Sequence, residues 1–131
     1  MRSNTHRPLI LIVFLFTLLN GASKLAVAQK YQRYQDAHTA VLSTIDDLDQ
    51  VISKDPEHDK GRARARIVSA KKSLSDFDHG LIDNRFNRRS LNSAMGDIRE
   101  VVNKNLLDAK ERDRLLADLY NLRGLHPMSG K

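Results

Sequence analysis

Arginine and aromatic side chains, a combination common in contact hot spots, cluster at Arg85, Phe86, Arg88 and Arg89. Helical apolar spacing stops before this cluster and resumes after it, which places it at the junction of a loop and a helix. Loops carry function more often than the elements they connect. A structural role is the alternative, since Phe86 could be buried and arginines oppose the dipole at a helix start. We predict that these residues contact a partner, either a protein or another envelope component.

A second basic run, residues 60–72, has two interpretations. It could form a patch for anionic lipid or for an envelope polymer. Alternatively, a helical hairpin could bring Arg62 level with Asp49 and Arg66 level with Asp46. Exposed ion pairs stabilise a protein by at most about 1 kcal/mol each, but they align the two helices. We expect the second arrangement.

Metal and haem chemistry has little support in the sequence. The histidines after residue 28 lie at positions 38, 58, 79 and 126, and none has another histidine at a metal-pair spacing. The acidic segment 76–83 fits a calcium loop in neither register. His38 and Met95 could hold a haem inside a helical bundle, so a haem, metal or small-ligand carrier is an alternative function. We predict no metal and no cofactor.

Catalytic motifs are incomplete. Residues 69–72 read S-x-x-K and residues 90–92 match part of its companion motif, but the K-T-G element of that enzyme class is missing. The chain also lacks a glycine-rich phosphate loop. We therefore predict that the protein is not an enzyme.

The segment Leu107–Arg112, LDAKER, resembles the L-T-x-x-Q segment of small periplasmic stress chaperones. Those proteins are also exported, basic, helical and cysteine-free. Asp108 stands where that family has Thr, Glu111 stands where it has Gln, and there is no second copy. The resemblance covers six residues and implies a stress-chaperone-like protein as a further alternative, with no functional residue carried over.

The first 28 residues have the parts of a secretory signal. A positively charged start precedes an apolar run, residues 9–19, which is shorter than the roughly 20 residues of a membrane span. Small side chains at Ala26 and Ala28 suit signal peptidase, so we predict cleavage after Ala28 and export to a bacterial periplasm or the exterior. An uncleaved anchor is the alternative, because Lys24 lengthens the stretch before the cut. The membrane would then be contacted only through this segment.

Removal of this signal changes the charge of the chain. The 131 residues include 22 Lys and Arg and 16 Asp and Glu, a net charge of +6. Arg2, Arg7 and Lys24 fall in the predicted signal with no acidic residue, which leaves +3. This small excess outside the cytoplasm argues against a nucleic-acid partner. The chain has no cysteine, which favours a periplasm over the disulfide-rich exterior of eukaryotic cells.

Apolar residues recur at every third or fourth position in four stretches, as in the helices of a bundle. The expected helices are residues 31–53, 56–78, 88–104 and 108–123. Their predicted inner faces are Tyr34, His38, Val41, Ile45, Leu48 and Ile52; Ala63, Ile67, Ala70, Leu74 and Phe77; Leu91, Ala94, Met95, Ile98, Val101 and Val102; and Leu115, Leu116, Leu119 and Leu122.

Boundary residues support these helices. Asp or Asn before a helix and Gly or Asn after it are typical caps, and Pro suits the first turn. The expected signals are Asp55 and Pro56 for the second helix start, left-handed Gly80 for its end, Asn87 and left-handed Asn105 for the third helix, and a capping box of Asp108 with Glu111, then Gly124, for the fourth.

The fold class predicted from these elements is all-α. We expect an up-down four-helix bundle, made of a long helical hairpin and a shorter one, in residues 29–124. A signal peptide of residues 1–28 precedes it and a flexible tail of residues 125–131 follows. The longer hairpin would leave apolar surface uncovered at one end, as a partner site or as the seam of a homo-oligomer.

Overall fold

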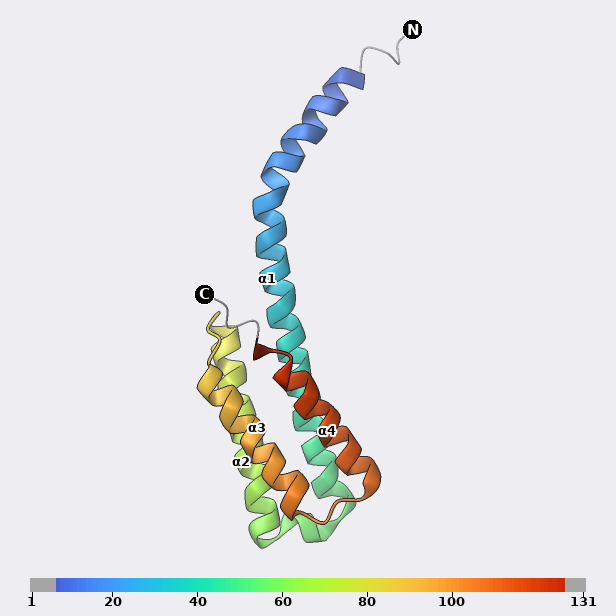
Figure 1. Cartoon of the computed structure of the whole chain (residues 1–131), viewed down its shortest axis with the longest axis vertical. Coiled ribbons are helices and arrows are strands. Elements are labelled where there is room, and N and C mark those ends of the chain that lie inside the picture. The colour runs from blue at the N-terminus through green and yellow to red at the C-terminus, as the bar shows by residue number, and fades with distance from the viewer. Residues whose placement is uncertain (1–6, 127–131) are drawn as a thin grey trace. The chain divides into compact units, whose positions relative to one another are not determined.

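The computed structural model of the chain describes the backbone of residues 7–126 and the side chains of residues 24–126. That part of the chain is all-helical and contains no strand, as predicted (Figure 1). Its elements are α1 (Arg7–Lys54), the 3-10 helix η1 (Pro56–Asp59), α2 (Gly61–Ile82), α3 (Arg88–Lys104) and α4 (Ala109–Arg123).

Two compact units divide the chain, Met1–Arg33 and Tyr34–Lys131. Helix α1 contributes to both, whereas the sequence predicted a helix that begins near residue 31. Residues 22–30 contain no glycine or proline that would end a helix, so the helix runs without a break into residue 31. Of the first unit's described side chains, Leu25, Val27 and Tyr31 are largely exposed. Within residues 24–126, whose side chains the structure describes, no helix combines the length and the hydropathy that a membrane span requires.

The second unit packs its helices as a bundle. Helix α2 packs most extensively against α3, and α4 packs against α3. Helix α1 reaches α2 through His38 Nδ1 and Asp78 Oδ1, 2.5 Å apart, and it reaches α4 through Gln50 Oε1, which accepts a 2.6 Å hydrogen bond from Arg114 Nη1. These contacts bring all four helices around one apolar core.

The predicted inner face of α3 is confirmed, and that of α2 is confirmed except for Ala63, which is only partly buried. On α1, Val41 and Leu48 are buried as expected, and the predicted Tyr34, Ile45 and Ile52 are partly buried against the core. The sequence missed Ala37, Thr44 and Val51, which are buried as well. Because α1 contacts both α2 and α4, its buried surface is centred between the row of side chains that faces α2 and the row that faces α4. The buried Thr44 hydroxyl donates to Ala40 O at 2.8 Å, so its burial leaves no donor unpaired.

Helix α4 also departs from its predicted inner face. Leu115 and Leu122 have no exposed surface, and Leu119 packs partly buried against the core. Leu116, however, is 47 % exposed, and Asp118 occupies a buried position between the two core leucines. Apolar side chains therefore lie on two faces of this helix, one inside the bundle and one outside it.

The connection between α1 and α2 is longer than predicted. Asp55 caps η1, since its side chain accepts a 3.0 Å bond from Glu57 N, and Pro56 occupies the first position. Helix α2 then begins separately at Gly61, whose φ of +50° favours glycine. The predicted second helix from Pro56 therefore starts five residues too early.

This longer connection changes the ion-pair register. Asp49 pairs with Lys71 instead of Arg62, and Arg66 Nη1 donates to Asn105 Oδ1 at 3.0 Å instead of pairing with Asp46. The predicted pairs are wrong because they assumed a turn centred near Pro56. The general expectation that a base on α2 aligns with an acid on α1 holds for Lys71 and Asp49.

Two helix ends differ from their predicted left-handed closures. Gly80 is helical and α2 continues to Ile82, after which Asn84 takes the left-handed conformation with φ 58°. Asn105 is extended and buried, and its Nδ2 donates to Ala63 O at 3.2 Å. Asn105 therefore fastens the end of α3 to the start of α2 instead of turning the chain.

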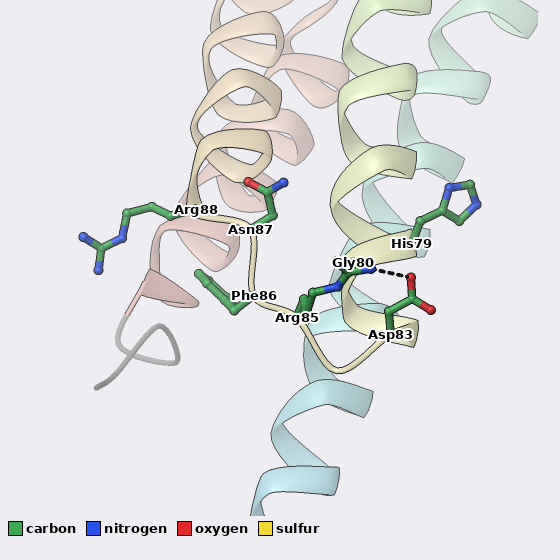
Figure 2. Close-up of a pocket in the computed structure, with 7 residues that line it drawn as sticks. All are labelled: His79, Gly80, Asp83, Arg85, Phe86, Asn87 and Arg88. Carbon is green, nitrogen blue, oxygen red and sulfur yellow. Dashed lines mark hydrogen bonds and ion pairs between the residues drawn. The ribbon is translucent and has the colours of Figure 1, made fainter.

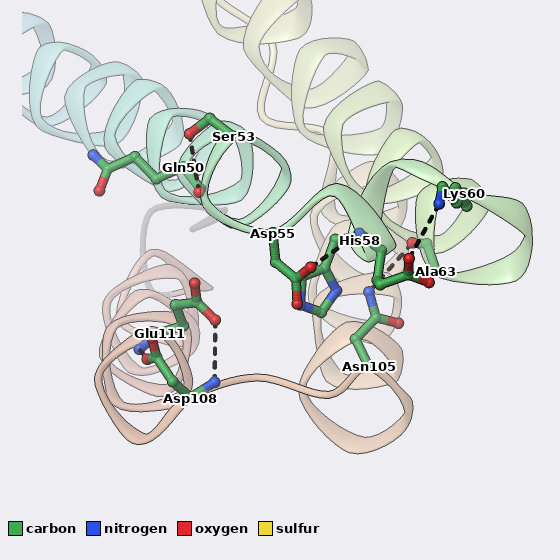
Figure 3. A network of polar contacts seen from close by, with 10 residues as sticks. Gln50, Ser53, Asp55, His58, Lys60, Ala63, Asn105, Asp108 and Glu111 are labelled. Atoms are coloured by element: carbon green, nitrogen blue, oxygen red, sulfur yellow. Dashed lines mark hydrogen bonds and ion pairs between the residues drawn. The ribbon is translucent and has the colours of Figure 1, made fainter.

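The capping box at the start of α4 is confirmed. Asp108 Oδ1 accepts a 2.7 Å bond from Glu111 N, and Glu111 Oε2 accepts a 3.1 Å bond from Asp108 N (Figure 3). The same end of the second unit holds Asn105 and the buried His58, so polar side chains close it (Figure 3).

Replacement of the cap should destabilise the bundle measurably. We expect Asp108→Ala to lower the free energy of unfolding by about 1 kcal/mol, because the Glu111 N–H at the start of α4 loses its acceptor. Lys110→Ala, an exposed neighbour, is the matched control and should change it by less than about 0.5 kcal/mol. Urea denaturation measures both, and equal effects would contradict the role of the cap.

Candidate functional site

The loop between α2 and α3 carries the residues predicted to contact a partner. Its path is fixed by Gly80, whose carbonyl accepts a 2.7 Å hydrogen bond from Arg85 N. A Cβ atom at Gly80 would lie only 3.0 Å from Arg85 O, so a larger residue there would push the loop away. The left-handed Asn84 completes the turn.

Phe86 anchors this loop to the core. Its ring is half-buried and meets Phe77 edge-on, with centroids 5.3 Å apart and planes at 86°. Such aromatic pairs contribute about 0.5–1.5 kcal/mol beyond the area they bury. The structural interpretation therefore describes Phe86 better than a free contact residue.

The arginines of the cluster are exposed. Arg85, Arg88 and Arg89 surround the start of α3, where Asn87 Oδ1 caps the helix by accepting a 3.1 Å bond from Ser90 N. Arg85 Nη2 lies 3.4 Å from Asp83 Oδ2, and Arg88 extends away from that pair (Figure 2). The guanidinium groups of Arg85 and Arg88 thus point apart instead of converging on one small anion (Figure 2).

A cavity of about 640 Å³ lies beside the loop (Figure 2). It brings together three of the four predicted contact residues, and Arg89 is not part of its wall. The lining residues are His79, Gly80, Asp83, Arg85, Phe86, Asn87 and Arg88. The positive end of the α3 dipole adds to the cationic character of this wall. Such a surface can hold spaced carboxylates of a larger partner.

The residues suggested for haem binding have structural roles. His38 Nδ1 is bonded to Asp78, and Met95 is buried in the core with 4 % exposure. Within the described part of the chain, no group of three or more His, Cys, Asp or Glu side chains could hold a metal ion. The carrier function stays a prediction without support from this geometry.

An acidic pair between α1 and α4 was not anticipated from the sequence. Asp118 is only 6 % exposed, and it shares a hydrogen bond with Asp47 while its Oδ2 atom has no partner. One signal was available, since Asp118 lies three residues after Leu115 and four before Leu122, on the inner face of α4. Burial and the neighbouring Asp47 raise the pKa of Asp118 to about 7.

The raised pKa of Asp118 should make stability fall as pH increases. The folded state holds this proton up to about pH 7, whereas the unfolded carboxyl loses it near pH 4, so stability declines between these values. We expect Asp118→Asn to remove this decline. At pH 8 the free energy of unfolding of this variant should exceed that of the wild type by about 1–2 kcal/mol, a value below the full effect of the pKa shift because water partly screens the carboxyl.

Urea denaturation at pH 5 and pH 8 measures the difference. Asp113→Asn, on an exposed position of the same helix, is the control and should retain the wild-type pH dependence. A wild type that gains stability between pH 5 and pH 8 would contradict the shifted carboxyl.

The loop surface and the pair of Asp47 and Asp118 are thus two places where the fold brings charged side chains together. Comparison of the chain with protein-family models, with curated proteins and with solved structures finds no match.

Proposed function

We propose that this chain is an exported, non-enzymatic helical module that binds an acidic partner protein through the loop between α2 and α3. The observation that carries the proposal is the set of exposed arginines, Arg85, Arg88 and Arg89, on a loop held by Gly80 and Phe86. A loop with a fixed conformation loses little entropy on binding. The divergence of the arginines favours a protein surface with several carboxylates over a single small ligand.

Export is supported by the sequence and agrees with where the core lies. Residues 1–28 have the composition of a signal peptide. The buried apolar cluster begins at Ala37, so removal of these residues would leave every core contact of the second unit in place. The remaining chain would form an up-down four-helix bundle in residues 29–124, followed by a short tail.

Mass spectrometry of the protein purified from its native host tests export. We expect a mature chain that starts at Gln29, because Ala26 and Ala28 present small side chains to signal peptidase. Ala28→Leu should block the cut and leave a heavier species that retains residues 1–28. A wild-type mass that still includes the apolar run at residues 9–19 would contradict cleavage.

Binding is tested by loss of the loop arginines. We expect the triple variant Arg85→Ala, Arg88→Ala, Arg89→Ala to lose a partner that the wild type retains from envelope extract of its native host, with at least a tenfold lower yield (about 1.4 kcal/mol). Removal of three exposed charges should leave helicity by circular dichroism unchanged. Higher salt should weaken the wild-type interaction, since the charges involved are exposed.

A charge-matched control separates this site from general basicity. The variant Arg62→Ala, Arg64→Ala, Lys72→Ala removes the same charge from exposed positions on α2. It should retain the partner as the wild type does. Equal loss in both variants, or no partner retained by the wild type, would refute the proposed site.

A further inference from the structure

A groove between α3 and α4 is distinct from the loop and lies on the outer side of α4. It has a volume of about 400 Å³. Arg99, Val102 and Asn103 line it from α3, and Leu116, Leu119, Tyr120 and Arg123 line it from α4. The side chain of Tyr120 is 79 % exposed, so it does not belong to the core of the bundle. Val102 and Leu119 also pack in the core, but Leu116 and Tyr120 leave apolar surface of the groove uncovered.

The spacing of the α4 residues matches a recognised docking mode. Leu116, Tyr120 and Arg123 occupy positions i, i+4 and i+7, which places them on one face over about 10 Å of helix. Two turns of a partner helix, with its own apolar residues at i, i+3 or i+4 and i+7, cover the same length. Tyrosine and arginine are also the residue types enriched in binding hot spots.

The charge of the groove selects its occupant. Arg99 and Arg123 line it, and Arg112 lies one turn before Leu116 on the same face of α4. Among the described side chains, none of these three arginines has an ion pair. Carboxylates on a partner would be attracted to these arginines and would form ion pairs with them.

Most acidic side chains of α3 and α4 are engaged elsewhere. Asp97 accepts from Ser73 of α2, Glu100 pairs with Lys104, and Asp118 bonds Asp47 of α1. Asp108 and Glu111 are bound to each other in the capping box. Asp113 alone, among the acids of these two helices, lacks such a contact in the described structure, and no acid lines the groove.

We propose that the groove between α3 and α4 docks an acidic amphipathic helix of a partner protein, with apolar side chains against Leu116 and Tyr120 and carboxylates against Arg99 and Arg123. A second copy of this chain fits poorly, because a symmetric contact would oppose the same arginines in both copies. A lipid bilayer fits poorly as well, since its flat surface does not fill a groove between helices.

Two helical peptides test the proposal with the full chain. Each is about 18 residues long, enough to sustain a helix when bound, and carries leucines at i, i+4, i+7 and i+11. One has glutamates beside this stripe and the other has lysines in their place. Fluorescence anisotropy should show that the glutamate peptide binds at least about tenfold more tightly than the lysine peptide.

Variants then locate the binding site. Tyr120→Ala should weaken binding of the glutamate peptide about tenfold, whereas Val68→Ala, at an exposed position on α2, should not. The double variant Arg99→Glu, Arg123→Glu should reverse the preference between the two peptides. The control Arg62→Glu, Lys72→Glu makes the same charge change on α2 and should keep the wild-type preference. All substituted side chains are exposed, and circular dichroism verifies that the bundle is folded.

Several outcomes would overturn the proposal. These are no binding of the glutamate peptide at about 1 mM, binding that the groove variants leave unchanged, or equal affinity for the two peptides. Anionic vesicles that bind the wild type and lose the Tyr120→Ala variant would assign the surface to a bilayer instead. A homodimer dissociated by the same variant would assign it to a second copy. The loop arginines are untouched in every arm, so this site and the loop can fail separately.

Discussion

The close packing of α2 against α3 is the constraint on which the rest of the second unit depends. Both ends of this helix pair are fastened by specific contacts. At one end, the loop is held by its hydrogen bond to Gly80 O and by the contact of Phe86 with Phe77. At the other end, Asn105 forms hydrogen bonds with Ala63 and Arg66. Between them, Ser69 and Ser73 donate to Asp97. Helices held at both ends cannot slide along each other, so their core faces remain aligned.

The other two helices join this pair through more polar contacts. Helix α1 reaches α2 through His38 and Asp78, and it meets α4 at the carboxyls of Asp47 and Asp118. A buried pair of carboxyls costs stability unless one of them keeps its proton. The seam between α1 and α4 therefore makes the stability of the core depend on pH, whereas the α2–α3 pair is held by apolar packing and by hydrogen bonds of Arg66, Asn105 and Asp97.

The sequence predicts correctly those parts of the fold that depend on a single local signal. Apolar spacing identified α3 completely, and the Asp108–Glu111 box located the start of α4, because both signals are local. The prediction was wrong where packing against a neighbouring helix decides which side chains are buried. Leu116, for example, lies next to the core residues of α4 but faces outward. The conformations of Gly80 and Asn105 depend on residues far along the chain. The divergence of the loop arginines is likewise set by the loop path, which residue types do not reveal.

The use of the acidic residues links the two basic surfaces. A net charge of +6 over the chain is modest, and an even mixture of charges would leave no cationic patch. In the second unit, however, many carboxylates have internal roles: Asp78 bonds His38, Asp97 bonds serines, and Glu111 caps a helix. Their charge is placed within or between helices while the arginines stay outside. The loop and the groove are thus cationic without a strongly basic composition because the fold uses acids as structural acceptors, and this is the basis of the proposed preference for acidic partners.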